Sequence, residues 1–129
     1  MTEQLSKSSL LSLASPYDIE STCQKIGAAL APLGFTLLFT VDHAAAAAKV
    51  GIVMPATRVL FFGNPANGSP LILQAPTLAI DLPARVLVAQ DASSKVKVSW
   101  NDPTFLQQRH GLSAPPLAAL GQTLASALA

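Results

Sequence analysis

The sequence contains little charge, few aromatic residues and a single cysteine. Charged residues make up 12% of its 129 residues and aromatic residues 5%, and the formal net charge is +1. Proteins that bind nucleic acids usually carry a basic face that neutralises phosphates, and no run of five Lys or Arg residues occurs here. The composition therefore argues against nucleic-acid binding, and we expect no nucleic-acid partner.

Long hydrophobic runs are also missing. No apolar run approaches the roughly 18 residues of a membrane-spanning helix. The apolar segment 10–14 is too short for the hydrophobic region of a signal peptide, and Glu3 stands where a basic flank is expected. The one cysteine, Cys23, cannot form an internal disulfide, which suits a reducing compartment. We predict a cytoplasmic protein with no membrane partner.

Hydrophobic residues, by contrast, make up half of the chain. A chain of this length hides about two-thirds of its unfolded surface on folding, which is enough for one ordinary core. We expect a single domain over residues 8–129, preceded by a disordered N-terminus over residues 1–7. Low charge combined with high apolar content favours self-association, so we expect a homodimer.

The first part of the chain predicts a strand, a helix and a second strand. The first strand is expected over residues 8–14, and Ser15 is expected to cap a helix that begins at Pro16. Alternating apolar residues predict the second strand over residues 35–41. The helix carries one apolar stripe, with spacings of three and four residues: Ile19, Cys23, Ile26, Leu30 and Leu33.

The rest of the chain predicts three more strands and further helices. In the strand over residues 95–100, we expect Val96, Val98 and Trp100 to face the core and Lys95, Lys97 and Ser99 to face water. The order strand, helix, four strands, helix predicts an α+β domain, a single antiparallel sheet with helices on one face. The expected elements are a short helix capped by Asp42, strands over 57–63, 85–91 and 95–100, a turn over 64–68, a helix from Ser69–Pro70 that Pro76 interrupts, a helix from Asp102–Pro103 to Gly111, and a final helix with Leu117, Leu120, Leu124 and Leu128 as its stripe.

Five short motifs occur in a characteristic order along the chain. Together they resemble a bacterial and archaeal family catalogued as domain of unknown function 302, over about residues 8–112. The resemblance implies a β-α-β₄-α fold similar in layout to half of the TATA-binding protein, and it implies no activity or catalytic residue. The family's usual tyrosine before Asn-Asp-Pro is Trp100 here. The motifs are Thr40-Val41-Asp42-His43-Ala44, Arg58-Val59-Leu60-Phe61-Phe62-Gly63-Asn64-Pro65, Asp81-Leu82-Pro83, Val98-Ser99-Trp100-Asn101-Asp102-Pro103 and Arg109-His110-Gly111-Leu112.

Polar residues beside three X-Pro corners form the candidate ligand site. If the last four strands form an antiparallel meander, the ends of strands 57–63 and 95–100 share an edge with the start of strand 85–91. Amides, carboxylates and an arginine at that edge could orient a small polar ligand. The structural alternative is that Arg85 pairs with Asp81 or Asp102 and fastens the corners. The expected ligand-binding residues are Asn64, Asp81, Arg85, Asn101 and Asp102.

The opposite edge offers an alternative site with Asp42, His43 and Arg58, near Asp91. His43 follows a predicted helix cap, where its imidazole could contact a substrate or could simply hold the corner. An enzyme centred on His43 or Asp102 is therefore the alternative to a small-molecule-binding or homodimeric module.

The remaining reactive side chains predict structural roles. Cys23 lies on the apolar stripe of its helix and is expected to pack as a small hydrophobe. His110 ends a helix and is expected to be a solvated capping group. No CxxC or HExxH motif, phosphate loop or nucleophile elbow is present. We predict no metal site and no cofactor, and we favour binding over catalysis.

Overall fold

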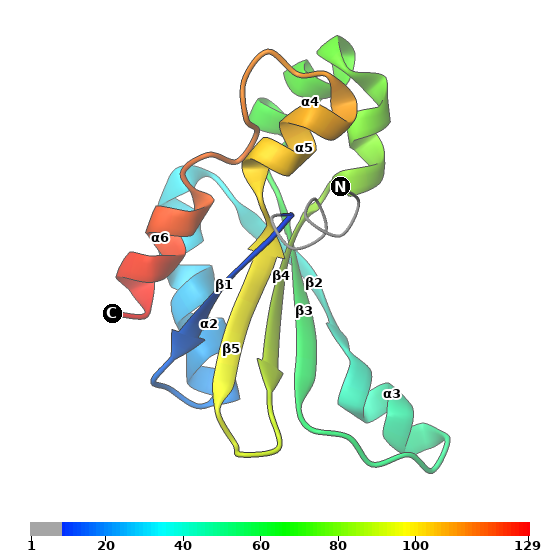
Figure 1. Cartoon of the computed structure of the whole chain (residues 1–129), viewed down its shortest axis with the longest axis vertical. Coiled ribbons are helices and arrows are strands. Elements are labelled where there is room, and N and C mark those ends of the chain that lie inside the picture. The colour runs from blue at the N-terminus through cyan, green and yellow to red at the C-terminus, as the bar shows by residue number, and fades with distance from the viewer. Residues whose placement is uncertain (1–8) are drawn as a thin grey trace.

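A five-stranded antiparallel sheet in the order β1-β5-β4-β3-β2 organises residues 9–129, the part of the chain that the computed structural model describes (Figure 1). The predicted α+β class is confirmed, whereas the expected disorder of residues 1–7 lies outside the described residues. The elements are β1 (Leu10–Ser15), α2 (Ile19–Leu30), η1 (Ala31–Leu33), β2 (Thr36–Asp42), α3 (His43–Lys49), β3 (Thr57–Gly63), α4 (Pro65–Gln74), η2 (Pro76–Asp81), β4 (Ala84–Gln90), β5 (Val96–Asn101), α5 (Pro103–His110) and α6 (Leu120–Ala127), where η marks a 3₁₀ helix.

Strands β2 to β5 form the expected meander, because each pairs antiparallel with the next. Strand β1 closes the other side of the sheet by pairing with β5, with Leu11 opposite Trp100. The ends of β3 and β5 and the start of β4 therefore lie at one end of the sheet. Helices α4 and α5 and the 3₁₀ helix η2 gather at that end (Figure 1).

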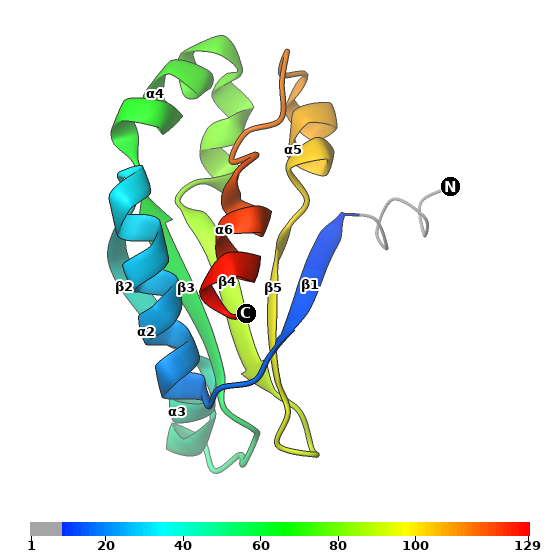
Figure 2. The same cartoon turned by 90° about the vertical axis from the view of Figure 1, so that its left-hand side faces the viewer.

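Helices α2 and α6 cover one face of the sheet (Figure 2). The core between them and the strands contains Val96, Val98 and Trp100, as predicted from the alternation in β5. Ser99 was expected to face water, and this is wrong: it is buried, and its hydroxyl lies 2.7 Å from the hydroxyl of Ser12. The reason is the neighbouring strand β1, whose pairing with β5 places the two serines opposite each other.

The start of α2 differs from the prediction. Asp18, and not Ser15, is the N-cap, because its carboxylate accepts a hydrogen bond of 2.7 Å from the Ser21 N–H. This bond lowers the pKa of Asp18 below its ordinary value. Ser15 belongs to β1 instead, and its hydroxyl lies 2.7 Å from that of Thr22.

The end of α2 also departs from the expected stripe. The α-helix stops at Leu30, and Pro32 lies in the following 3₁₀ turn. Leu33 therefore leaves the stripe and is partly exposed, while Thr22 is buried on the helix face that meets the core.

Residues 64–68 begin a helix and not a turn. Asn64 stands at the N-cap position of α4 and Pro65 at its first helical position, where a missing N–H costs nothing. The helix then accommodates Pro70 in its interior, so the expected start at Ser69–Pro70 is wrong. Pro76 starts η2, which packs its Leu78 into a small second core with Ala75 and Leu112.

The last two helices, α5 and α6, agree with most of the predicted caps and buried positions. Asp102 caps α5 through a hydrogen bond of 2.9 Å from the Thr104 N–H, and Gly111 ends it with φ 69°. Leu117 lies before α6, but Leu120, Leu124 and Leu128 are buried as a stripe.

In the range 9–129, no helix is both long enough and apolar enough to cross a bilayer.

Candidate functional site

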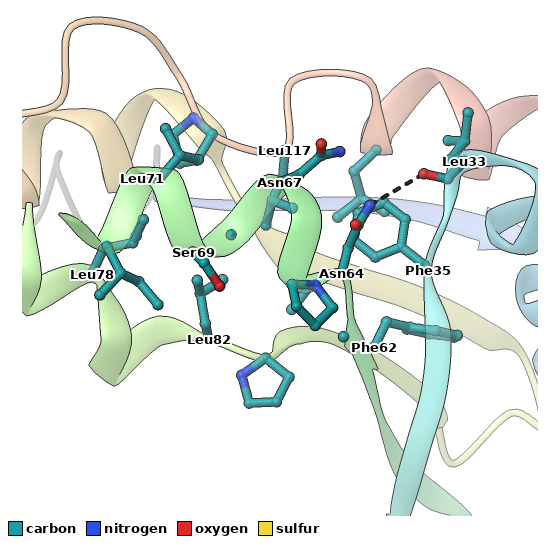
Figure 3. Close-up of a pocket in the computed structure, with 18 of the residues that line it drawn as sticks. Leu33, Phe35, Phe62, Asn64, Asn67, Ser69, Leu71, Leu78, Leu82 and Leu117 are labelled. Carbon is teal, nitrogen blue, oxygen red and sulfur yellow. Dashed lines mark hydrogen bonds between the residues drawn. The ribbon is translucent and has the colours of Figure 1, made fainter. Parts of the chain in front are cut away.

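A pocket of about 540 Å³ opens at the end of the sheet where α4 and η2 meet the strand ends (Figure 3). Helix α4 forms one wall, the segment from η2 to the start of β4 forms the second, and the ends of η1 and β3 form the third. Segment 116–120, which leads into α6, closes the remaining side. The volume falls within the range of about 300–1,000 Å³ that is typical of small-molecule sites.

The pocket lining is largely apolar. The polar side chains on it are Asn64, Asn67 and Ser69, all on or next to the first turns of α4. Among the described residues, none that lines the pocket is charged. The main apolar contributors are Leu33, Phe35, Leu38, Phe62, Leu71, Ile72, Leu78, Leu82, Pro83 and Leu117.

Asn64 is the predicted site residue that lines this pocket. Its Nδ2 donates a hydrogen bond of 3.2 Å to the Leu33 carbonyl, which fixes the orientation of the amide (Figure 3). Gly34 permits this arrangement: its φ of 90° suits glycine, and a Cβ there would lie 3.2 Å from Asn64 Nδ2. Within residues 9–129, no hydrogen bond engages Asn64 Oδ1. An acceptor oxygen of fixed orientation is therefore available at the pocket wall.

The other four residues of the predicted edge do not line this pocket, so the expectation that Asn64, Arg85 and Asp102 share one concavity does not hold for it. Arg85 Nη2 donates to the Ile80 carbonyl at 3.0 Å, and its guanidinium lies over the Phe61 ring. Asn101 ends β5, and Asp102 caps α5. These side chains fasten the corners, although Arg85 does so without the expected Asp81 or Asp102 partner.

Asp81 instead joins a second cluster, which the sequence analysis did not anticipate. His110 Nε2 lies 2.5 Å from Asp81 Oδ2, and Arg109 Nη1 lies 3.2 Å from Asp81 Oδ1. The other ring nitrogen, His110 Nδ1, lies 2.8 Å from Thr77 Oγ1. The prediction that His110 is solvated is wrong, because its side chain is 3% exposed and that of Asp81 is 10% exposed. The cluster joins η2 to the end of α5.

At the opposite end of the sheet, Asp42 and Arg58 are brought together as register partners of β2 and β3. Arg58 Nη1 donates to Glu20 Oε2 at 2.7 Å, and Arg58 Nε lies 3.8 Å from Asp42 Oδ2. The hydrogen bond with Glu20 raises the pKa of Arg58 further. Asp42 also caps α3 through the Ala45 N–H at 2.9 Å, which makes His43 the first residue of that helix.

Asp91, the remaining residue of that edge, lies in the turn between β4 and β5. Its carboxylate accepts hydrogen bonds of 2.8 Å from the Ser93 N–H and 3.0 Å from the Lys95 N–H. Asp91 therefore serves as a turn residue and is separate from the Asp42–Arg58 pair.

The described residues form no metal-ligating cluster, and the single thiol packs against the core. Within residues 9–129, no group of three or more His, Cys, Asp or Glu side chains could hold a metal ion. Cys23 is half-buried and packs against the core, as the stripe predicted. Burial raises the pKa of its thiol, and the nearby Arg58 opposes this effect.

Comparison with known families and with solved structures points to the same family. Residues 11–129 match a family model described as "Domain of unknown function DUF302". The fold is similar to a crystal structure of an uncharacterized conserved protein DUF302 from Bacillus stearothermophilus, with a TM-score of 0.75. That match covers 92% of this chain and 94% of the other, at 18% sequence identity, so it shows a common fold.

Curated relatives include longer proteins from Brucella. Over 105 residues the chain is 37% identical to a protein named "Fluoride-specific ion channel FluC 1" from Brucella suis biovar 1 (strain 1330). The match covers 81% of this chain and 41% of that protein. A protein of the same name from Brucella abortus biovar 1 (strain 9-941) is also 37% identical, with 39% of its length covered. The chain thus spans about two-fifths of the length of these relatives.

Proposed function

The chain belongs to the DUF302 family, and from this premise we propose that it is a small-molecule-binding module whose ligand occupies the pocket between α4, η2 and the strand ends. The observation that carries the proposal is the combination of an apolar hollow of about 540 Å³ with a polar oxygen, Asn64 Oδ1, that has no hydrogen-bond partner within residues 9–129. Small-molecule sites commonly combine an apolar lining with a few polar groups that orient the ligand.

The lining favours an uncharged ligand. Transfer of an ion into an apolar site is costly unless an opposite charge pairs with it, and the described lining residues supply no such charge. The charged residues of the predicted edge, Asp81, Arg85 and Asp102, do not line the pocket and so do not supply it either. The class of ligand expected from the sequence, a small polar molecule, is therefore restricted to neutral molecules.

Asn64 defines the polar end of this ligand. One of the two N–H groups of its Nδ2 donates to the Leu33 carbonyl, and its Oδ1, as an amide oxygen, can only accept a hydrogen bond. A matching ligand presents one N–H or O–H to Asn64, and an apolar body to the leucines and phenylalanines of the walls. The hydroxyl of Ser69 and the amide of Asn67 offer further polar contacts at the mouth of the pocket.

The test is a titration with N-phenyl-1-naphthylamine, a neutral, largely apolar fluorophore with one N–H. We expect its fluorescence to rise on binding, and neutral metabolites with an N–H or O–H to displace it. The variant Ser69→Trp fills the pocket from α4 and should abolish binding. The control Leu73→Trp places the same side chain elsewhere on α4, at a residue that is 85% exposed and does not line the pocket.

The polar contact is tested separately with ligands found by displacement. Loss of one hydrogen bond typically costs about 1 kcal/mol, so Asn64→Ala should weaken such a ligand by roughly fivefold to tenfold. Asp102→Ala and Asp91→Ala should leave ligand affinity unchanged, since neither residue lines the pocket. Equal binding by the wild type and by Ser69→Trp would reject the proposed site.

A homodimer is a second candidate function, and the open face of the sheet favours it. Phe39 is 51% exposed and stacks on Phe61, with ring centroids 4.5 Å apart. Phe61 alternates along β3 with the buried Leu60 and Phe62, so it points away from the face that α2 and α6 cover. An exposed aromatic pair of this kind is typical of an interaction surface. Light scattering at high protein concentration should report twice the chain mass, and a monomer would contradict the proposed dimer.

We also propose the cytoplasm as the location, on the ground of the single unpaired cysteine.

A further inference from the structure

The cluster of Thr77, His110 and Asp81 lies outside the proposed ligand pocket and has the connectivity of an activated nucleophile. A hydroxyl, an imidazole and a carboxylate follow one another at 2.8 Å and 2.5 Å. In nucleophilic catalysis, a base within hydrogen-bond distance activates the hydroxyl, and a third group orients that base. The three residues come from two elements that are distant in sequence, η2 and α5.

The geometry suits an imidazole that acts as a base. A carboxylate can only accept, so His110 Nε2 donates a hydrogen bond to Asp81. When the imidazole is neutral, Nδ1 carries no proton and accepts a hydrogen bond from the Thr77 hydroxyl. Arg109 Nη1 donates to the two Asp81 oxygens at 3.2 Å and 3.3 Å, which helps to fix the position of that carboxylate.

The burial of His110 and the exposure of Thr77 suit nucleophilic catalysis. The side chain of His110 is 3% exposed, so its ring is held in one orientation, whereas Thr77 is exposed and accessible to a reactant. Thr77 is the second residue of η2, so its backbone N–H belongs to the first turn, where the N–H groups have no acceptor inside that helix. An amide N–H at the nucleophile can donate to the oxyanion that forms when a carbonyl is attacked.

We propose that Thr77 is the nucleophile of an acyl-transfer site for small activated esters, with His110 as its base and Asp81 as the residue that positions the imidazole. Thr77 Oγ1 forms a bond to the ester carbonyl carbon while its proton passes to His110 Nδ1. The bond from that carbon to the leaving oxygen breaks, and the leaving oxygen keeps the electron pair. An alcohol takes the proton back from His110 as it departs, whereas a phenolate departs as the anion and His110 releases the proton to water. In the second step water gives a proton to His110 and attacks the acyl-threonine, and His110 returns that proton to Thr77 Oγ1 as the acid is released.

The experiment uses the full chain with p-nitrophenyl acetate at neutral pH. We expect rapid release of nitrophenolate and an acetyl group that peptide mass mapping places on Thr77. Thr77→Ala should lose the adduct, and Thr77→Ser should retain it. His110→Gln keeps Thr77 but removes the base, and it should slow acylation by about 100-fold, the scale of general-base catalysis.

Two controls separate this reactivity from general acetylation. Ser113→Ala removes another exposed hydroxyl near the end of α5, which donates a hydrogen bond to Gln74 Oε1, and this variant should acylate like the wild type. Thermal unfolding of each variant shows that the fold is retained. Absence of an acetyl group on Thr77, or equal labelling of Thr77 in a folded His110→Gln variant, would overturn the proposal. Ser69→Trp should leave this labelling intact, because the two sites are separate.

Discussion

The two faces of the sheet carry apolar residues of similar kind in different surroundings. On the face that α2 and α6 cover, Leu60, Val86 and Val98 are buried in the core. On the other face, Phe61 and Phe39 stack on each other, and Phe39 is 51% exposed. The same alternation along β3 thus supplies both faces. Apolar residues on the covered face stabilise the fold, whereas those on the open face are available to a partner.

Trp100 gives the largest expected effect on the covered face. Its side chain is 6% exposed and packs so closely on α6 that a Cβ at Gly121 would lie 3.3 Å from the indole ring. Trp100→Ala should lower the free energy of unfolding by roughly 3–5 kcal/mol, the range for large aromatic truncations in cores. Urea denaturation measures this loss. A loss below about 1 kcal/mol would contradict the assignment of the covered face.

Phe39 provides the matching test on the open face. Phe39→Ala removes one exposed aromatic contact, so a single protomer should lose only about 0.5–1.5 kcal/mol. Phe39→Asp places a charge on the same surface and should convert the proposed dimer to a monomer without unfolding it. Sedimentation velocity and circular dichroism on the same samples distinguish the two effects. A dimer that survives Phe39→Asp would show that the open face is not the interface.

Glu20 tests a contact at the margin of the covered face. Its carboxylate pairs with Arg58 across α2 and β3, but the side chains are 64% and 29% exposed. Exposed ion pairs contribute about 0–1 kcal/mol, because water and salt screen them. Glu20→Gln should therefore change the unfolding free energy by less than about 1 kcal/mol, and high salt should remove the difference. A larger, salt-independent loss would indicate that Glu20 has a role in packing.

The local patterns of the sequence predicted the sheet well. Alternation identified Val96, Val98 and Trp100 as core residues, and Asp102 and Gly111 marked the limits of α5, because these signals depend on neighbours in the chain. The patterns failed where tertiary packing overrode a local signal. Ser15–Pro16 predicted a cap at Ser15, but the pairing of β1 with β5 includes Ser15 in the strand, and the helix begins later with Asp18 as its cap.

The candidate sites were less accessible to sequence reasoning, since they depend on which elements meet. The meander correctly placed Asn64 at one end of the sheet. The pocket around it also needs Leu33 in a 3₁₀ turn and a helix that already begins at Pro65, whereas the sequence predicted a continuous helix stripe through Leu33 and a turn over residues 64–68. The Asp81-Leu82-Pro83 and Arg109-His110-Gly111-Leu112 motifs were both noted. Their contact could not be derived, because it requires the packing of η2 on α5.

Cys23 supplies the smallest expected effect, a pH dependence that originates on the covered face. Burial raises the pKa of its thiol, so the folded state holds this proton more tightly than the unfolded state does. The associated stability is fully present below the ordinary thiol pKa of about 8.5, and it is lost as the pH rises through the higher pKa of the folded state. Wild-type protein should thus lose more stability in this alkaline range than Cys23→Ser, whose hydroxyl does not titrate there. Paired urea denaturations across the range isolate the thiol, because every other ionisable side chain is common to the two proteins. Parallel stability curves for the two proteins would show that Cys23 is as well solvated in the folded state as in the unfolded chain.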